Sequence, residues 1–106
     1  MRILFIGDIV GRPGRQAIAR VLPEWRERYA PDIILANGEN SAGGNGMTPQ
    51  VAEELFALGI AGFTMGNHVW DKKEIYPLLD SDPRIARPAN YSPLAPGKGV
   101  IFFEVL

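Results

Sequence analysis

The chain has 106 residues, of which 46% are hydrophobic and 22% are charged, a composition typical of one ordinary globular domain. Its formal net charge is −1 and its basic residues are scattered, which argues against a stable complex with nucleic acid. It contains no cysteine, no signal-peptide pattern and no apolar run long enough to span a bilayer. We therefore expect a cytoplasmic protein without disulfides, thiolate metal sites or membrane contact.

The first part of the chain predicts two strands joined by a helix. The apolar run RILFI at residues 2–6 has the length of a strand covered on both faces of a parallel sheet. Apolar residues spaced three and four apart predict a helix over residues 14–29, which Pro23 kinks or restarts. The run DIILA at residues 32–36 predicts a second buried strand.

The alternation of strands and helices continues to the end of the chain. The segment TPQVAEELFALG predicts a helix with Thr48 as its N-cap, Pro49 in its first turn and Gly59 at its end. The remaining predicted elements are a strand at residues 61–65, a short helix at residues 71–79 and a strand at residues 99–106. This order predicts a single-domain α/β fold, in which right-handed β-α-β crossovers build a parallel-rich sheet.

Polar side chains follow three of the predicted strands. Asp8 follows the first strand, Glu39 and Asn40 follow the second, and Asn67 and His68 follow the third. Because the carboxyl ends of parallel strands meet at one edge of the sheet, we expect these side chains to lie together. Carboxylate and amide oxygens suit hard or borderline divalent cations, and imidazole shifts the preference toward Mn, Fe or Zn. The pattern therefore indicates a metal site.

Each of these residues also has a structural explanation when it is taken alone. Asp8, Asn40 and Asn67 are residue types that favour turns. His68 is the only histidine of the chain, and a single loop histidine is more often structural than catalytic. Glu39 is the exception, because a carboxylate at the end of a buried strand is costly unless a positive group meets it. The joint pattern favours a functional site over five separate structural roles.

A nucleotide-binding module without metal catalysis is the alternative from another class. Gly7, Gly11 and Gly14 follow the first strand and precede a helix, and Glu39 stands where a Rossmann fold binds ribose. The spacing is not that of the G-x-G-x-x-G fingerprint. Asp8 would also repel a pyrophosphate at the first turn, whereas a cation would be attracted there.

Three segments carry a family resemblance: FIGDIVGRPGR, ILANGENSAGG and TMGNHVWD. Together they resemble the YmdB-like branch of the calcineurin-type metallophosphoesterases. Val10 stands where the wider superfamily has a histidine, and Glu39-Asn40 stands where it has its bridging aspartate, as in this branch. The resemblance implies half of an αββα sandwich.

The resemblance also implies the cofactors and the reaction. Asp8, Glu39 and Asn40 would bind one metal ion, Glu39 would bridge to a second ion, and Asn67 would bind that second ion. His68 would act on the substrate. The two ions would be divalent or of mixed valence, with Fe or Mn favoured over Zn or Mg. The substrate would be a phosphodiester, and we expect a cyclic nucleotide of the 2′,3′ type.

The chain differs from that family in its length and in its histidine count. The later part of the family contributes several histidine ligands to the two metals, and this chain has one histidine. We therefore expect residues 1–106 to form the N-terminal portion of a metallophosphoesterase domain, with little or no activity alone. An inactive fragment that self-associates as a homo-oligomer is the third hypothesis, because an uncovered apolar face invites association.

Overall fold

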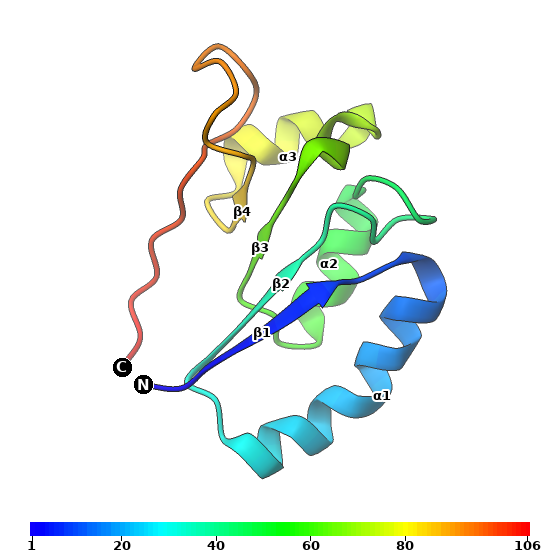
Figure 1. The fold of residues 1–106 in the computed structure, drawn as a ribbon, viewed down its shortest axis with the longest axis vertical. Helices are drawn as coiled ribbons and strands as arrows, with labels where there is room; N and C mark the ends of the chain where they lie inside the picture. Colours follow the sequence, from blue (N-terminus) through cyan, green and yellow to red (C-terminus); the bar gives the residue numbers. More distant parts are fainter.

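Four parallel strands form one sheet in a computed structural model that describes all of residues 1–106 (Figure 1). The strands are β1 (Ile3–Asp8), β2 (Ile33–Asn37), β3 (Gly62–Thr64) and β4 (Ile85–Ala86), and they lie in that order across the sheet. Every neighbouring pair is parallel. The predicted α/β fold with β-α-β crossovers is therefore confirmed.

Three helices connect the strands. They are α1 (Gly11–Tyr29), α2 (Pro49–Ala57) and α3 (Tyr76–Ser81), and two short 3-10 turns, η1 (Asn67–Trp70) and η2 (Lys73–Ile75), precede α3. The N-cap prediction for α2 is confirmed, because Thr48 Oγ1 accepts a hydrogen bond from Val51 N at 3.2 Å. No helix is both long enough and apolar enough to cross a membrane.

Helix α1 differs from its prediction at Pro23 and at its start. It runs unbroken through Pro23, so the expected restart there is wrong. Proline inside a helix costs about 3 kcal/mol, and burial of the apolar face of the helix offsets that cost. Ile18 and Leu22 are both buried in the core. The helix begins at Gly11 rather than at residue 14, because Pro13 in its first turn is compatible with helix.

The helices cover one face of the sheet. Successive strands are added in one direction, and right-handed crossovers then place every connecting helix on the same side. Phe63 of β3 points toward this side, where its ring centroid lies 5.0 Å from that of Phe56 in α2. The core forms here, with Ile34, Ala36 and Leu55 among its buried residues.

The opposite face of the sheet is largely uncovered. Ile3 is 60% exposed and Phe5 is 51% exposed, whereas their neighbours Leu4 and Ile6 pack against the core. The prediction that the first strand is covered on both faces is therefore wrong. A continuous apolar run cannot distinguish a strand buried on two faces from one that exposes alternate apolar side chains.

The C-terminal segment does not form the strand predicted at residues 99–106. It adopts no regular structure, and only an isolated bridge between Ala86 and Lys98 joins it to the sheet. A side chain at Gly62 would collide with Phe103, so this part of the segment lies over β3 on the face away from α2. Figure 1 shows it passing along the side of the sheet opposite α1. The short strand β4, which the sequence did not predict, takes the fourth place, and α3 with η2 replaces the helix predicted at residues 71–79.

Candidate functional site

The carboxyl ends of β1, β2 and β3 are aligned across the sheet. Asp8 pairs with Asn37, and Asn37 pairs with Thr64 on its other side. Neighbouring strands lie about 4.8 Å apart, so the loops that follow them begin next to one another. The strand-end residues therefore start from one edge of the sheet, as predicted.

Asp8 and Asn40 are in direct contact. Asn40 Nδ2 lies 3.1 Å from Asp8 Oδ1 and 3.0 Å from Asp8 Oδ2, and it donates to the carboxylate. The backbone places Asn40 there, because its carbonyl oxygen accepts a hydrogen bond from Gly11 N at 2.9 Å. The first turn of α1 thus holds the loop after β2 against the end of β1.

Glu39 lies between the loops that follow β2 and β3. Its Oε1 accepts a hydrogen bond from Asn37 Nδ2 at 3.1 Å, and its Oε2 accepts one from the backbone N–H of His68 at 3.3 Å. A Cβ atom at Gly66 would overlap both carboxylate oxygens, so only glycine leaves room for Glu39 there. We expected a positive group to meet this carboxylate, but within this chain neutral N–H donors do so.

His68 contacts Asp71 one turn later in the chain. His68 Nδ1 lies 2.8 Å from Asp71 Oδ2, and the two side chains are 44% and 31% exposed. Asn45 Nδ2 donates to the same Asp71 oxygen at 3.3 Å. The pKa of Asp71 is lowered, chiefly by the hydrogen bond with His68, against the raising effect of burial.

Asn67 is the predicted residue that the structure joins least closely to the others. It lies at the start of η1, next to His68, and its side chain makes no hydrogen bond within the chain. The five predicted residues thus form a contact between Asp8 and Asn40, a second contact between Glu39 and the backbone of His68, and an adjacent free amide.

These side chains are of the kind that bind divalent cations, but too few of them lie together to hold an ion. Asp8 and Glu39 offer carboxylate oxygens, and Asn40 and Asn67 offer amide oxygens, which is the chemistry that such cations prefer. No group of three or more His, Asp or Glu side chains gathers closely enough to hold an ion. In this chain amide N–H groups occupy the carboxylate oxygens that a cation would otherwise contact.

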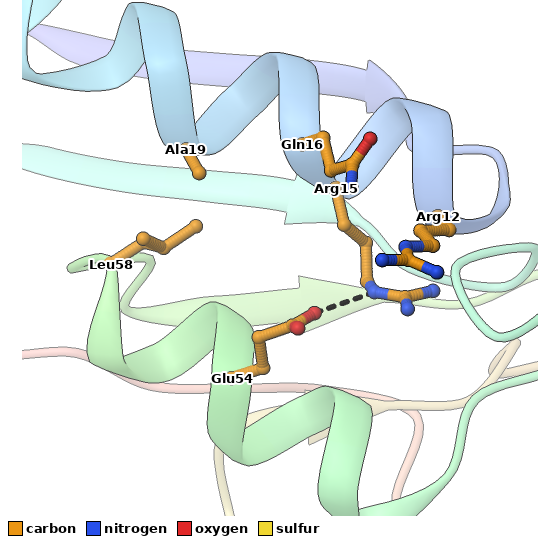
Figure 2. Close-up of a pocket in the computed structure, with 6 residues that line it drawn as sticks. All are labelled: Arg12, Arg15, Gln16, Ala19, Glu54 and Leu58. Carbon is orange, nitrogen blue, oxygen red and sulfur yellow. Dashed lines mark hydrogen bonds and ion pairs between the residues drawn. The ribbon is translucent and has the colours of Figure 1, made fainter.

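The loop that carries Glu39 and Asn40 is held from α1. Arg15 Nη1 donates to the carbonyl oxygen of Ser41 at 2.6 Å, and Arg15 Nε contacts Glu54 of α2 at 2.5 Å. This pair lines a cavity of about 220 Å³ between the two helices (Figure 2). The cavity is lined by none of the five predicted site residues. Arg15 connects the cavity to these residues, because it also binds the loop that carries Glu39 and Asn40.

Asn37, Asn45 and Asp71 were not predicted as part of the site. Asn37 ends β2 and could have been found as a polar residue directly before the Gly-Glu-Asn turn. Asp71 follows His68 by three residues, a spacing that places two side chains together on one helical turn. Asn45 gave no local signal, because the turn in the Gly-rich loop brings it to Asp71.

Residues 4–106 match the family described as YmdB-like protein. A 2′,3′-cyclic-nucleotide 2′-phosphodiesterase of Bacillus subtilis (strain 168) is 46% identical over 104 residues, which cover 98% of this chain. Among solved structures, a hypothetical protein from Thermus thermophilus is 46% identical, with a TM-score of 0.90 over 99% of this chain. A novel phosphatase from Mycoplasma pneumoniae is 29% identical, with a TM-score of 0.92 over 100% of this chain.

The chain spans only part of each of these relatives. It covers 39% of the Bacillus subtilis protein, 40% of the Thermus thermophilus chain and 39% of the Mycoplasma pneumoniae chain. The family match counts against the dinucleotide alternative, which depended on an imperfect glycine spacing and on the position of Glu39.

Proposed function

Because this chain belongs to the YmdB-like protein family over residues 4–106, we propose that it carries part of a dinuclear-metal phosphodiesterase site. The proposed reaction is hydrolysis of a cyclic nucleotide of the 2′,3′ type. The name of the Bacillus subtilis relative supports this substrate. The position of Glu39 is the observation that carries the proposal. Its carboxylate joins the loops after β2 and β3, beside the end of β1 that bears Asp8.

The proposed metal ligands on this chain are Asp8, Glu39, Asn40 and Asn67. Glu39 would bridge the two ions, because its carboxylate lies between the loops that follow β2 and β3. When bound, two divalent ions would lower the pKa of a water molecule and neutralise charge on the phosphodiester. Asp8 and Glu39 would exchange their amide N–H partners for these ions. The family resemblance favours Fe or Mn over Zn or Mg, and the expected histidine ligands count against Mg alone.

His68 is the proposed acid in this reaction. Water adds to phosphorus, and the bond from phosphorus to one ribose oxygen breaks with its electron pair on that oxygen. The proton on Nε2 of His68 passes to this oxygen, while the attacking water loses a proton, so that a cyclic diester and water give a monoester. General acid catalysis of this kind contributes about 10²- to 10⁴-fold in rate. Nδ1 is occupied by Asp71, which leaves Nε2 as the nitrogen for substrate.

We also propose that residues 1–106 form the N-terminal portion of the catalytic domain. Three observations support this: the chain spans 39% of the Bacillus subtilis relative, its sheet has one uncovered apolar face, and its carboxylates are too few for two metal shells. The remaining histidine ligands would belong to a following part of the domain.

The test uses residues 1–106 alone and fused to the part of the Bacillus subtilis relative that follows the match. We refer to this second protein as the fusion. We expect the fusion to hydrolyse a 2′,3′-cyclic nucleotide to a single monophosphate, to lose activity with a chelator and to regain it with Mn²⁺. The chain alone should show little turnover. A fusion that folds and binds metal but cleaves no phosphodiester would contradict the proposed function. A discrete oligomer without metal binding would favour the self-associating fragment.

A further inference from the structure

His68 is fixed through one ring nitrogen, and this contact is not explained by the proposed metal site. Nδ1 lies 2.8 Å from Asp71 Oδ2. An ionised carboxylate can only accept a hydrogen bond, so Nδ1 must carry the proton that forms this bond. The neutral ring then has its lone pair on Nε2, and this nitrogen must take up a proton before His68 can act as the proposed acid.

Asp71 is itself held by a second loop. Asn45 of the Gly-rich segment donates to the same Asp71 oxygen at 3.3 Å. The backbone reaches this position through left-handed glycines, with φ of +67° at Gly43, +96° at Gly44 and +73° at Gly46. At Gly46 a Cβ atom would meet Lys72 and the Cβ of Asp71, so the loop packs closely on the residues after η1.

We infer that Asp71 is the positioning residue of His68, fixing the Nδ1–H tautomer and directing Nε2 to the substrate, and that Asn45 fixes Asp71. This inference rests on the proposed function for the role of Nε2, but not for the tautomer. Loss of the carboxylate partner of a catalytic histidine permits the wrong tautomer and can cost about 10⁴-fold in kcat where the arrangement is known. The inference also gives the Gly-rich loop a role, since that loop delivers Asn45.

The first experiment is nitrogen-15 NMR of the imidazole in residues 1–106. Because the chain has one histidine, a long-range proton–nitrogen spectrum contains one set of ring signals. At a pH about two units above the ordinary imidazole pKa of ~6.5, we expect the Nδ1–H tautomer. Asp71→Ala should shift the ring toward the Nε2–H tautomer, and Asn45→Ala should shift it partly.

The matched control is Glu74→Ala, which removes a nearby exposed carboxylate that makes no hydrogen bond to the ring. This variant should leave the tautomer unchanged. An Nε2–H tautomer in the unaltered chain would overturn the inference without any variant, even if Asp71→Ala fails to fold. A folded Asp71→Ala chain that keeps Nδ1–H would overturn it as well.

The second experiment uses the fusion and two leaving groups. If Asp71 acts through His68, Asp71→Ala should lower kcat at least about 100-fold for a cyclic nucleotide, whose ribose oxygen needs a proton. The loss should stay below about 10-fold for bis(4-nitrophenyl) phosphate, whose leaving group needs none, and KM should change little. Equal losses for both substrates would overturn the positioning role. An unaltered fusion that cleaves neither substrate would contradict the proposed function instead, and the NMR result would stand.

Discussion

Single residues determine whether the candidate ligands can approach one another. Gly66 illustrates this best, because it is needed for space and not for an unusual backbone angle. The Glu39 carboxylate lies where a side chain at residue 66 would begin. Gly66 thus leaves the space that the Glu39 carboxylate occupies, although Glu39 lies 27 residues earlier in the sequence.

Gly66→Ala should displace Glu39 and break its hydrogen bond from His68 N. Forcing an extra methyl group into a packed position costs about 1–3 kcal/mol, so the free energy of unfolding should fall by that amount. Urea denaturation measures this change, and the amide signal of His68 reports the lost bond. Gly7→Ala is the matched control, because a Cβ atom there meets nothing within 4 Å. Equal effects of the two substitutions would contradict the account of Gly66.

A second residue-scale prediction concerns Asp82 and the pH dependence of stability. The pKa of Asp82 is lowered, chiefly by the side-chain hydrogen bond from Arg84, while burial raises it. A carboxyl group whose pKa is lower in the folded chain stabilises the fold above its unfolded pKa of about 3.9. That stabilisation is lost as the pH falls through the folded pKa.

Asp82→Asn should therefore destabilise the chain by about 0.2–1 kcal/mol at neutral pH, the range measured for exposed ion pairs. The difference from the unaltered chain should shrink as the pH falls below about 4. Urea denaturation at both pH values measures it, with Glu53→Gln as an exposed control. A difference that stays constant between the two pH values would refute this assignment.

At the scale of elements, α1 and α2 fix the loop that carries Glu39 and Asn40. Arg15 connects both helices to this loop through Glu54 and the Ser41 carbonyl, and Ser41 Oγ closes the turn by donating to Gly38 O at 2.7 Å. Arg12 lines the same cavity, and its side chain makes no hydrogen bond (Figure 2). Arg15 therefore connects the loop to both helices, whereas the Arg12 side chain does not.

Arg15→Met should loosen the loop and leave the helices in place. The substitution keeps most of the side-chain stem but removes both polar contacts, which should cost about 1–2 kcal/mol. Amide hydrogen exchange should become faster at residues 38–46. Arg12→Met is the control and should change neither stability nor exchange. Faster exchange spread evenly over the chain would argue against a local role for Arg15.

The elements also show how far the sequence could predict the fold. The strands ending at Asp8 and Asn37 and the capped helix after Thr48 were predictable, because local patterns specify them. The strand predicted at residues 99–106 failed because Phe103 packs over Gly62 instead of extending the sheet. Which apolar run pairs and which covers a face depends on tertiary contacts.

The candidate site was predictable to a similar degree. Asp8, Glu39 and His68 could be grouped because parallel strands share one carboxyl edge. Asn37 and Asp71 were missed because their role is to hold other side chains, and a strand end or a helical turn explains them equally well. The sequence also could not predict that the Asn67 side chain makes no hydrogen bond within the chain. A strand end fixes the backbone but does not specify where the side chain lies.

At the scale of the whole molecule, three features support the proposal that residues 1–106 are the N-terminal portion of the catalytic domain. Ile3 and Phe5 leave an apolar surface on the face of the sheet away from the helices. The carboxylates of Asp8 and Glu39 meet only amide N–H groups. Relatives of this family are longer than the chain, which covers 39% of the Bacillus subtilis protein. The C-terminal part of the domain proposed above would cover this face and supply further metal ligands.

Glu39 is the proposed bridging ligand between the two metal ions of the phosphodiesterase site. The most direct measurement compares the metal content and the cyclic-nucleotide turnover of the fusion with those of its Glu39→Gln variant. Glutamine keeps the shape of the side chain but removes the negative charge that a bridging ligand requires. We expect the variant to fold, to bind less than the full complement of metal and to lose at least about 1,000-fold in turnover, as removal of metal assistance implies. Unchanged turnover with full metal content would contradict the claim.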